Sequence, residues 1–282
     1  YQIDYADLAA AGFDAHGVDP RTFQLHSRGQ EVAIDVTGEA DGSFDPGDAI
    51  IFYGEKTDTK YTDINVYWLT WGGGDGARMV TLDGSPSGMA PVPAHFEVTQ
   101  RVEENNQYRS YYPNGPDHDH WFWTTVQANT TTVRNYHTIV ESVANNPLSA
   151  TVSGLFQGYY APTGNQHTQV YLNGYLVDDA IWGARQAYAF ETAVPQSFLV
   201  EGDNTIAVEF PFDQGNFLEI LFINRFEIAY NKAFMAQIPQ TFFAADTAGT
   251  WEYQVTGFPS TTIETFDITS PTLTTRILSS TV

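Results

Sequence analysis

The chain contains no cysteine among its 282 residues. Disulfide bonds, thiolate metal sites and a cysteine nucleophile are therefore excluded. A cysteine peptidase attacks its substrate with a thiolate, so the chain by itself cannot have that activity. The chain also lacks the G-x-S-x-G motif, so it carries no serine-hydrolase signature. We expect a chain that is not itself an enzyme.

Basic residues and long apolar runs are also scarce. Twelve Lys and Arg residues stand against 34 Asp and Glu residues, which gives a formal net charge of −22. A nucleic acid or an anionic membrane surface would have to bind against this field, so we expect neither as a partner. No apolar run approaches the roughly 20 residues that a membrane-spanning helix needs, and no leader pattern opens the chain. We expect no transmembrane segment.

Aromatic residues, glycine and proline are plentiful instead. The chain is 15% aromatic and has 23 Gly and 14 Pro, a composition that favours a bacterial extracellular β-protein. It begins with Tyr1 rather than Met and ends in strand-like sequence. We therefore expect that a leader has been removed or left out, and that the natural chain continues.

The stretch from His167 to Tyr230 indicates strands joined by tight turns. The pair Asn173-Gly174 lies between two short apolar runs and predicts a type I′ hairpin, which needs positive φ at both central positions. The last segment alternates, which predicts a strand with one buried face. The expected buried side is Leu218, Ile220, Phe222, Phe226, Ile228 and Tyr230. The expected solvent side is Glu219, Arg225 and Glu227.

Alternation over most of the remaining chain predicts an all-β protein of two β-domains. The exception is a short helix over residues 4–11, with Gly12 after its end. We expect an N-terminal β-domain over residues 1–93, completed by residues 235–282. Residues 95–232 are predicted to form a jelly-roll-like β-sandwich.

Several sequence blocks, spread over nearly the whole chain, stand in the same order as in a known protein family. They are YADLAAAGFD, DGSFDPGDAIIFYG, YTDINVYWLTWG, DHDHWFW, VYLNG, EGDNTIAVEF, FINRFEIAY and FDIT followed by a proline. Together they resemble the region upstream of the catalytic domain in gingipain-like cysteine peptidases, a group that includes the sortase of the type IX secretion system. The FDPGD-FYG and FINRFEIAY blocks are the most specific.

The resemblance implies a function outside catalysis. It implies a non-catalytic N-terminal region, accessory or prodomain-like, of a bacterial peptidase that is secreted or located at the cell envelope. Its partner would be its own downstream His-Cys catalytic domain, starting near or beyond residue 282. No catalytic residue carries over, because the family nucleophile is a cysteine. The alternative that we keep is a carbohydrate-binding β-sandwich of an extracellular protein.

One acidic loop could hold calcium. Asp41, Asp45 and Asp48 lie among glycines and a proline, and Ca²⁺ prefers carboxylate and carbonyl oxygens in such loops. The EF-hand spacing is not met, and ordinary turn chemistry explains the same composition. Ca²⁺ is therefore a candidate cofactor, with the turn as the alternative.

Aromatic side chains could instead hold a glycan. Trp182, Tyr159, Tyr160 and Asn216 are the candidates, because sugar C–H faces stack on aromatic rings while hydroxyls take polar partners. Large aromatics are also the usual filling of a β-sandwich core, and we favour that interpretation.

A third cluster is the run Asp117-His118-Asp119-His120. In a strand His118 and His120 would share one side, which offers two ligands to a divalent metal of a hydrolase. Two histidines make an incomplete site, so we favour a structural loop.

Overall fold

The computed structural model describes residues 1–57, 59, 62–115, 118–145, 147–237, 240–245 and 247–280. It is 44% strand and 7% helix, which confirms the all-β prediction. The chain divides into two compact units. Unit 1 comprises residues 1–87 and 259–282, and unit 2 comprises residues 88–258. In this division residues 235–258 fall with unit 2. Within the described ranges no helix is long and apolar enough to cross a membrane.

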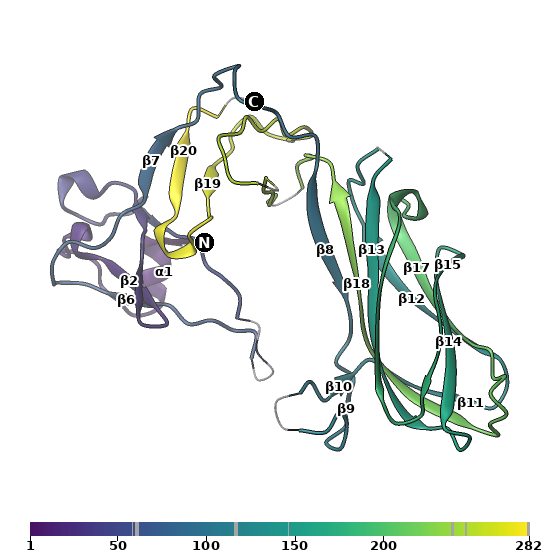
Figure 1. Ribbon diagram of the computed structural model, residues 1–282. Helices are drawn as coiled ribbons and strands as arrows, with labels where there is room; N and C mark the ends of the chain where they lie inside the picture. The colour runs from purple at the N-terminus through teal and green to yellow at the C-terminus, as the bar shows by residue number, and fades with distance from the viewer. Residues whose placement is uncertain are drawn as a thin grey trace. The chain divides into compact units, whose positions relative to one another are not determined.

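Unit 2 is a sandwich of two antiparallel sheets. In Figure 1 its long strands β8, β18 and β13 run side by side. The first sheet has the order β11-β18-β13-β16. On one edge of β18, β11 pairs with its first part and β8 pairs with its second part. Its strands are β8 (Phe96–Val102), β11 (Thr124–Ala128), β13 (Ser149–Tyr160), β16 (Ala187–Pro195) and β18 (Glu219–Lys232).

The second sheet of unit 2 has the order β12-β17-β14-β15. Its strands are β12 (Thr132–Val140), β14 (Asn165–Leu172), β15 (Tyr175–Gly183) and β17 (Gly202–Phe210). Alternate residues of both sheets meet in one apolar core, whose fully buried members include Phe156, Phe210 and Phe226. A short pair, β9 (Gln107–Tyr108) and β10 (Trp121–Phe122), packs Phe122 on Phe222 of β18.

The predicted hairpin is confirmed. Asn173 and Gly174 connect β14 to β15 with φ values of 49° and 86°. Asparagine and glycine accept this left-handed backbone at least cost, which explains why the turn occurs at this pair.

The predicted single buried face of β18 is wrong over its first half. Leu155 pairs with Arg225 and Phe156 with Ile223, so Asn224 is an extra residue opposite the junction of the partner strand. Such a bulge reverses the alternation. Leu221 and Ile223 therefore enter the core beside Phe226, Ile228 and Tyr230. Glu219, expected at the surface, lies on this inner side and is buried.

Unit 1 is built from much shorter strands. Its described residues form three three-stranded sheets, with the orders β1-β5-β4, β3-β2-β6 and β19-β20-β7. The strands are β1 (Gln2–Asp4), β2 (Gln24–Ser27), β3 (Gln30–Val32), β4 (Asp35–Val36), β5 (Ala49–Ile51), β6 (Trp68–Thr70), β7 (Val80–Asp83), β19 (Thr265–Asp267) and β20 (Thr275–Leu278).

The predicted short helix is α1 (Tyr5–Ala10). Asp4 caps it, because its side chain accepts a hydrogen bond from the backbone N–H of Asp7. Gly12 follows its end with φ 83°, as a left-handed C-terminal position requires. The unit has its own core, in which Phe23 and Phe44 are fully buried and pack edge to face.

Candidate functional site

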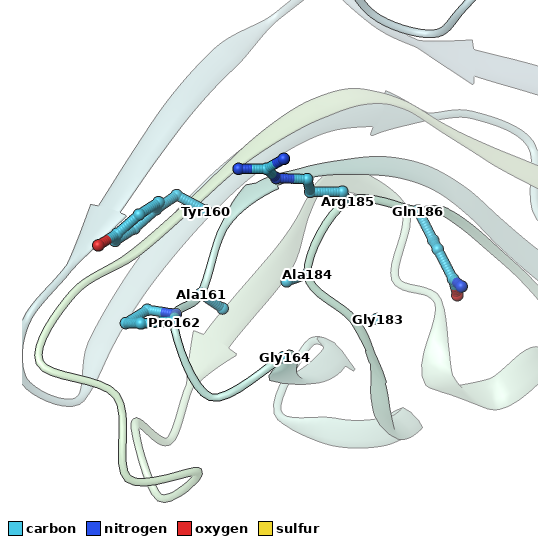
Figure 2. Close-up of a pocket in the computed structure, with 8 residues that line it drawn as sticks. All are labelled: Tyr160, Ala161, Pro162, Gly164, Gly183, Ala184, Arg185 and Gln186. Carbon is cyan, nitrogen blue, oxygen red and sulfur yellow. The ribbon is translucent and has the colours of Figure 1, made fainter.

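A surface pocket lies where two connections of unit 2 meet at one end of the sandwich. One connection joins β13 to β14 and the other joins β15 to β16. The backbone N–H of Ala184 donates to the carbonyl of Gly164 at 2.9 Å, which fixes the two connections together. The pocket has a volume of about 420 Å³. Its lining residues, shown in Figure 2, are Tyr160, Ala161, Pro162, Gly164, Gly183, Ala184, Arg185 and Gln186.

The lining combines an aromatic ring with a cation. Figure 2 shows the Arg185 guanidinium extending toward Tyr160, whereas Gln186 points away from them. The Tyr160 ring also meets Phe217 edge on, with 6.2 Å between the ring centroids. An arginine offers planar N–H donors to carboxylates and hydroxyls, and an aromatic ring offers a stacking face. The pocket could therefore hold a small polar or anionic ligand that carries an apolar face.

Asn216, one of the predicted glycan ligands, forms hydrogen bonds with the connection between β13 and β14 that contributes to this pocket. Its Oδ1 accepts from the N–H and the hydroxyl of Thr163, at 3.0 and 2.8 Å. Its Nδ2 donates to the Asn165 carbonyl at 2.8 Å and to Glu219 Oε1 at 2.7 Å. The amide is buried, and both its oxygen and its nitrogen are engaged within the chain, so Asn216 positions the loop. Glycan contact by Asn216 stays a prediction.

Beside this loop, His167 lies between two carboxylates. Its Nε2 is 2.7 Å from Asp179 Oδ1, and its Nδ1 is 2.9 Å from Asp213. Burial acts to lower the pKa of His167, but the hydrogen bonds to Asp179 and Asp213 outweigh burial and raise that pKa above its usual value. The hydrogen bond from His167 lowers the pKa of Asp179. The ring therefore joins β14, β15 and the loop after β17 through charge.

The remaining glycan candidates do not share one surface. Trp182 is 7% exposed, its Nε1 donates to Thr168 Oγ1 at 3.0 Å, and its ring stacks on Tyr188. Its faces therefore lie within the core. Tyr159 is 43% exposed and packs on Tyr112 and Phe222, apart from the partners of Tyr160. Of the four candidates, Tyr160 alone lines the pocket.

Two of the three carboxylates of the predicted calcium loop, those of Asp41 and Asp48, accept hydrogen bonds within the loop. Asp41 accepts from the N–H of Ser43 at 3.0 Å, and Asp48 accepts from the N–H of Asp45 at 2.8 Å. Asp48 also lies against Gly38, where a Cβ would be 1.9 Å from its Oδ1. The described part of the chain contains no group of three His, Asp or Glu side chains that could hold a metal ion. Calcium binding by this loop stays a prediction.

The histidine cluster ties a loop together. Asp117 lies outside the described residues. The Nδ1 of His120 lies 3.0 Å from the Tyr112 carbonyl, and its Nε2 lies 2.9 Å from the Gly115 carbonyl. Both ring nitrogens thus face backbone oxygens, which fits the structural-loop alternative.

Arg185 was missed by the sequence analysis. It is one of only 12 basic residues and occupies a turn between two strands. A lone cation in a turn of an acidic chain was the available signal. Its neighbour Tyr160 is 25 positions away in sequence, so their meeting could not be predicted from either segment.

Comparisons with known proteins give a likeness in fold. No family model and no curated protein matches the chain. The crystal structure of dimeric latent PorU from Porphyromonas gingivalis matches over 100% of the chain, with a TM-score of 0.65 and 13% identity. The chain spans 28% of the length of PorU. The likeness shows that the chain has the fold of a PorU region.

Two carbohydrate-binding modules match part of the chain. One is the CBM36-1 domain of a xylanase from the hindgut metagenome of Trinervitermes trinervoides, which covers 46% of the chain and 96% of its own length at TM-score 0.32 and 11% identity. The other is CBM36 in complex with calcium and xylotriose, which covers 47% and 99% at TM-score 0.30 and 14% identity. These likenesses are too distant to bear on function.

Proposed function

We propose that the chain is the non-catalytic N-terminal region of a secreted gingipain-like cysteine peptidase. The observation that carries this proposal is the fold likeness to PorU along the full length of the chain, which spans only 28% of PorU. PorU belongs to the gingipain-like group that the ordered sequence blocks resemble. The absence of cysteine agrees, since the nucleophile then lies on another domain.

The role of the region is to pack against that catalytic domain. Each unit has an apolar core of its own, so each can offer a preformed surface. Contacts between domains of one chain bury about 600–1,500 Å², enough to support folding of a neighbour or to cover its active site. The region would work outside the cell or at the cell envelope, together with the peptidase.

The test is to produce the downstream catalytic domain with and without residues 1–282. Folding yield and peptidase activity are measured, and the separate chain is then added back. A low yield without the region identifies folding support, whereas activity that falls on add-back identifies inhibition. As a control, the Phe156→Ala variant, which lacks a core side chain, is added back in place of the parent chain. If neither yield nor activity depends on the region, the proposal is wrong.

A second candidate function is glycan binding at the pocket. The observation that favours it is the placement of Tyr160 and Arg185 on one pocket (Figure 2). A glycan array with neutral and acidic sugars tests it, with Tyr160→Ala and Arg185→Met as the disabling variants. Tyr159→Ala is the matched control, since that tyrosine packs elsewhere. Micromolar binding that is lost in the first two variants and kept in the control supports this function.

A further inference from the structure

One edge of β12 has no strand beside it. β12 (Thr132–Val140) is the end strand of the second sheet of unit 2, and among the described residues it pairs with β17 alone. In an antiparallel pair the backbone N–H and C=O groups of alternate residues point toward the partner, whereas those of the residues between them point away from it. About half of the backbone groups of this nine-residue strand therefore lie along a free edge.

A second cavity of unit 2 runs along this edge. It has a volume of about 360 Å³, and four consecutive residues of β12, 134–137, line it. Neighbouring side chains of a strand point to opposite faces of the sheet. A cavity that touches four residues in a row therefore borders the edge of the strand and its backbone. The volume is within the range of ligand pockets, about 300–1,000 Å³.

The other wall of the cavity belongs to the first sheet, at an interruption of its edge. β8 ends at Val102 and β11 begins at Thr124, and both strands pair with the same edge of β18. Glu104, which follows β8, and Trp123, which precedes β11, line the cavity at this interruption. The cavity therefore lies on an open side of the sandwich, between edge strands of its two sheets.

Two aromatic rings meet at this cavity. Trp123 is half-buried, and its ring centroid lies 4.6 Å from that of Tyr136, a core residue that is 5% exposed. Tyr136 is the middle residue of β12 and faces the core. A strand added to the free edge would place one of its own side chains next to Tyr136 on the same face of the sheet, beside the Trp123 ring. The site thus offers backbone pairing along its length and an apolar anchor position at its middle.

The charges around the edge favour a neutral or basic occupant. Glu104 lines the cavity, and Asp203 and Glu209 lie on β17 directly across from β12. Arg134, the one arginine of β12, donates to the carbonyl of its own neighbour Val133 at 3.1 Å. The chain as a whole carries a formal charge of −22. Such a field attracts basic ligands and disfavours acidic ones.

We propose that the free edge of β12 binds an extended, neutral or basic peptide segment, which adds a fifth strand to the second sheet and packs an apolar side chain against Trp123. Peptides that add to a sheet edge gain affinity from main-chain hydrogen bonds and specificity from pockets for alternate side chains. An oligosaccharide could stack on Trp123, but it has no alternating N–H and C=O groups to match the strand edge. The inference goes beyond the proposed function, because it requires neither a catalytic domain nor the pocket at Tyr160.

The test titrates the whole chain with a fluorescent synthetic peptide as long as β12, in which Thr and Val alternate about a central Phe and each end is Lys. We expect micromolar binding that saturates at one peptide per chain and weakens when Glu replaces both Lys residues. Amide hydrogen exchange followed by NMR should slow at alternate residues of β12 when the peptide is bound, because the outward N–H groups alone gain a partner.

N-methylation of the peptide separates backbone pairing from side-chain contact. One peptide carries N-methyl groups at its odd positions and a second carries them at its even positions. The peptide whose methyl groups face β12 should lose binding, since it lacks the donors of the ladder, and the other should bind like the parent peptide. If the two peptides bind equally, whether well or not at all, pairing with one strand edge is excluded.

Two variants of the chain test the anchor position. Trp123→Ala should weaken binding by about tenfold or more, as truncation of an anchoring tryptophan does. Trp121→Ala is the matched control and should bind like the parent, because Trp121 packs on Tyr108 and is not among the residues that line the cavity. If Trp123→Ala fails to fold, the exchange pattern of the parent chain decides, because unchanged exchange in β12 contradicts the site.

Other outcomes also overturn the proposal. Slower exchange in β15 or β16, with none in β12, would place the peptide on a different edge of the sandwich. A peptide that does not bind at millimolar concentration would show that the edge is protected rather than used. If neutral oligosaccharides bind instead, and Trp123→Ala abolishes that binding, the cavity is a sugar site.

Discussion

The two units of this chain stabilise their β-folds in different ways. In unit 2 the strands β13 and β18 are 12 and 14 residues long and close over one shared core. In unit 1 the described strands are only two to four residues long. Strands this short pair over few positions, so turns, aromatic contacts and side chain to backbone hydrogen bonds must supply what pairing does not.

Arg78 illustrates how hydrogen bonds from a side chain to the backbone stabilise unit 1. Its guanidinium donates to the carbonyls of Phe23 and Pro20, at 3.1 and 2.8 Å, and to Glu39 at 2.8 Å. One side chain thus fixes three segments that share no strand. In unit 2 the corresponding buried polar contact is side chain to side chain, from Asn216 to Glu219 at the start of β18.

The largest expected loss of stability comes from removing a core phenylalanine, one variant for each unit. Phe156→Ala and Phe44→Ala remove side chains that are both fully buried, and each should cost about 3–5 kcal/mol. We expect hydrogen exchange followed by mass spectrometry to speed up within unit 2 for the first variant and within unit 1 for the second. Equal acceleration in both units for either variant would mean that they unfold as one body.

The next effect is the removal of Arg78. Arg78→Met should destabilise unit 1 by about 2–3 kcal/mol, because buried carbonyls and Glu39 lose a charged donor. Arg21→Met is the matched control. Arg21 pairs with Asp19 at the surface, where water and salt screen the two charges, so Arg21→Met should leave the stability of unit 1 nearly unchanged. Urea unfolding curves measure both, and equal losses would show that unit 1 does not depend on the Arg78 hydrogen bonds.

A pH effect of intermediate size should come from His167 in unit 2. Its pKa is raised in the fold, so its stabilisation is complete below the unfolded value of about 6.5 and is lost as the pH rises through the folded pKa. Asp179 has a lowered pKa, so its part is present above about pH 4 and is lost on acidification. The contribution is therefore largest between about pH 4 and 6.5.

The measurement compares the parent chain with His167→Ala in calcium-free buffer. The variant should lose about 1–2 kcal/mol at pH 5.5, an estimate reduced because both carboxylates are half-exposed. The difference should shrink toward pH 9. A difference that stays constant from pH 5.5 to pH 9 would show that packing alone explains the loss.

The smallest effect concerns a turn. Gly174→Ala puts a Cβ on a residue with φ 86°, although nothing lies within 4 Å of that Cβ. The loss should therefore be about 1 kcal/mol, all of it from the backbone. Gly73→Ala, which has the same open space and no positive φ, should be neutral or slightly stabilising. A similar loss for both would rule out the backbone as the cause.

The sequence could predict the features of the fold that depend on neighbouring residues alone. The Asn173-Gly174 hairpin, the short helix and the all-β class rest on local rules, and all three are confirmed. The buried face of β18 depended on unbroken alternation, and one extra residue at Asn224 reversed it. No local pattern marks that bulge.

The candidate site was harder to predict for a related reason. Tyr160 was named from the sequence, but Arg185 joins it only because two connections meet at the end of a sandwich. Glu219 was expected at the surface because the reversal at Asn224 was not foreseen. Sites assembled by tertiary contact leave little trace in any one segment.

The measurement that tests the proposed function most directly is made on the native polypeptide. Its full gene is read, and the purified protein is labelled with a thiol-directed reagent and mapped by mass spectrometry. We expect residues 1–282 to be followed by a His-Cys peptidase domain whose single essential cysteine takes the label with loss of activity. A polypeptide that ends near residue 282, or that continues into an unrelated domain, would contradict the proposal outright.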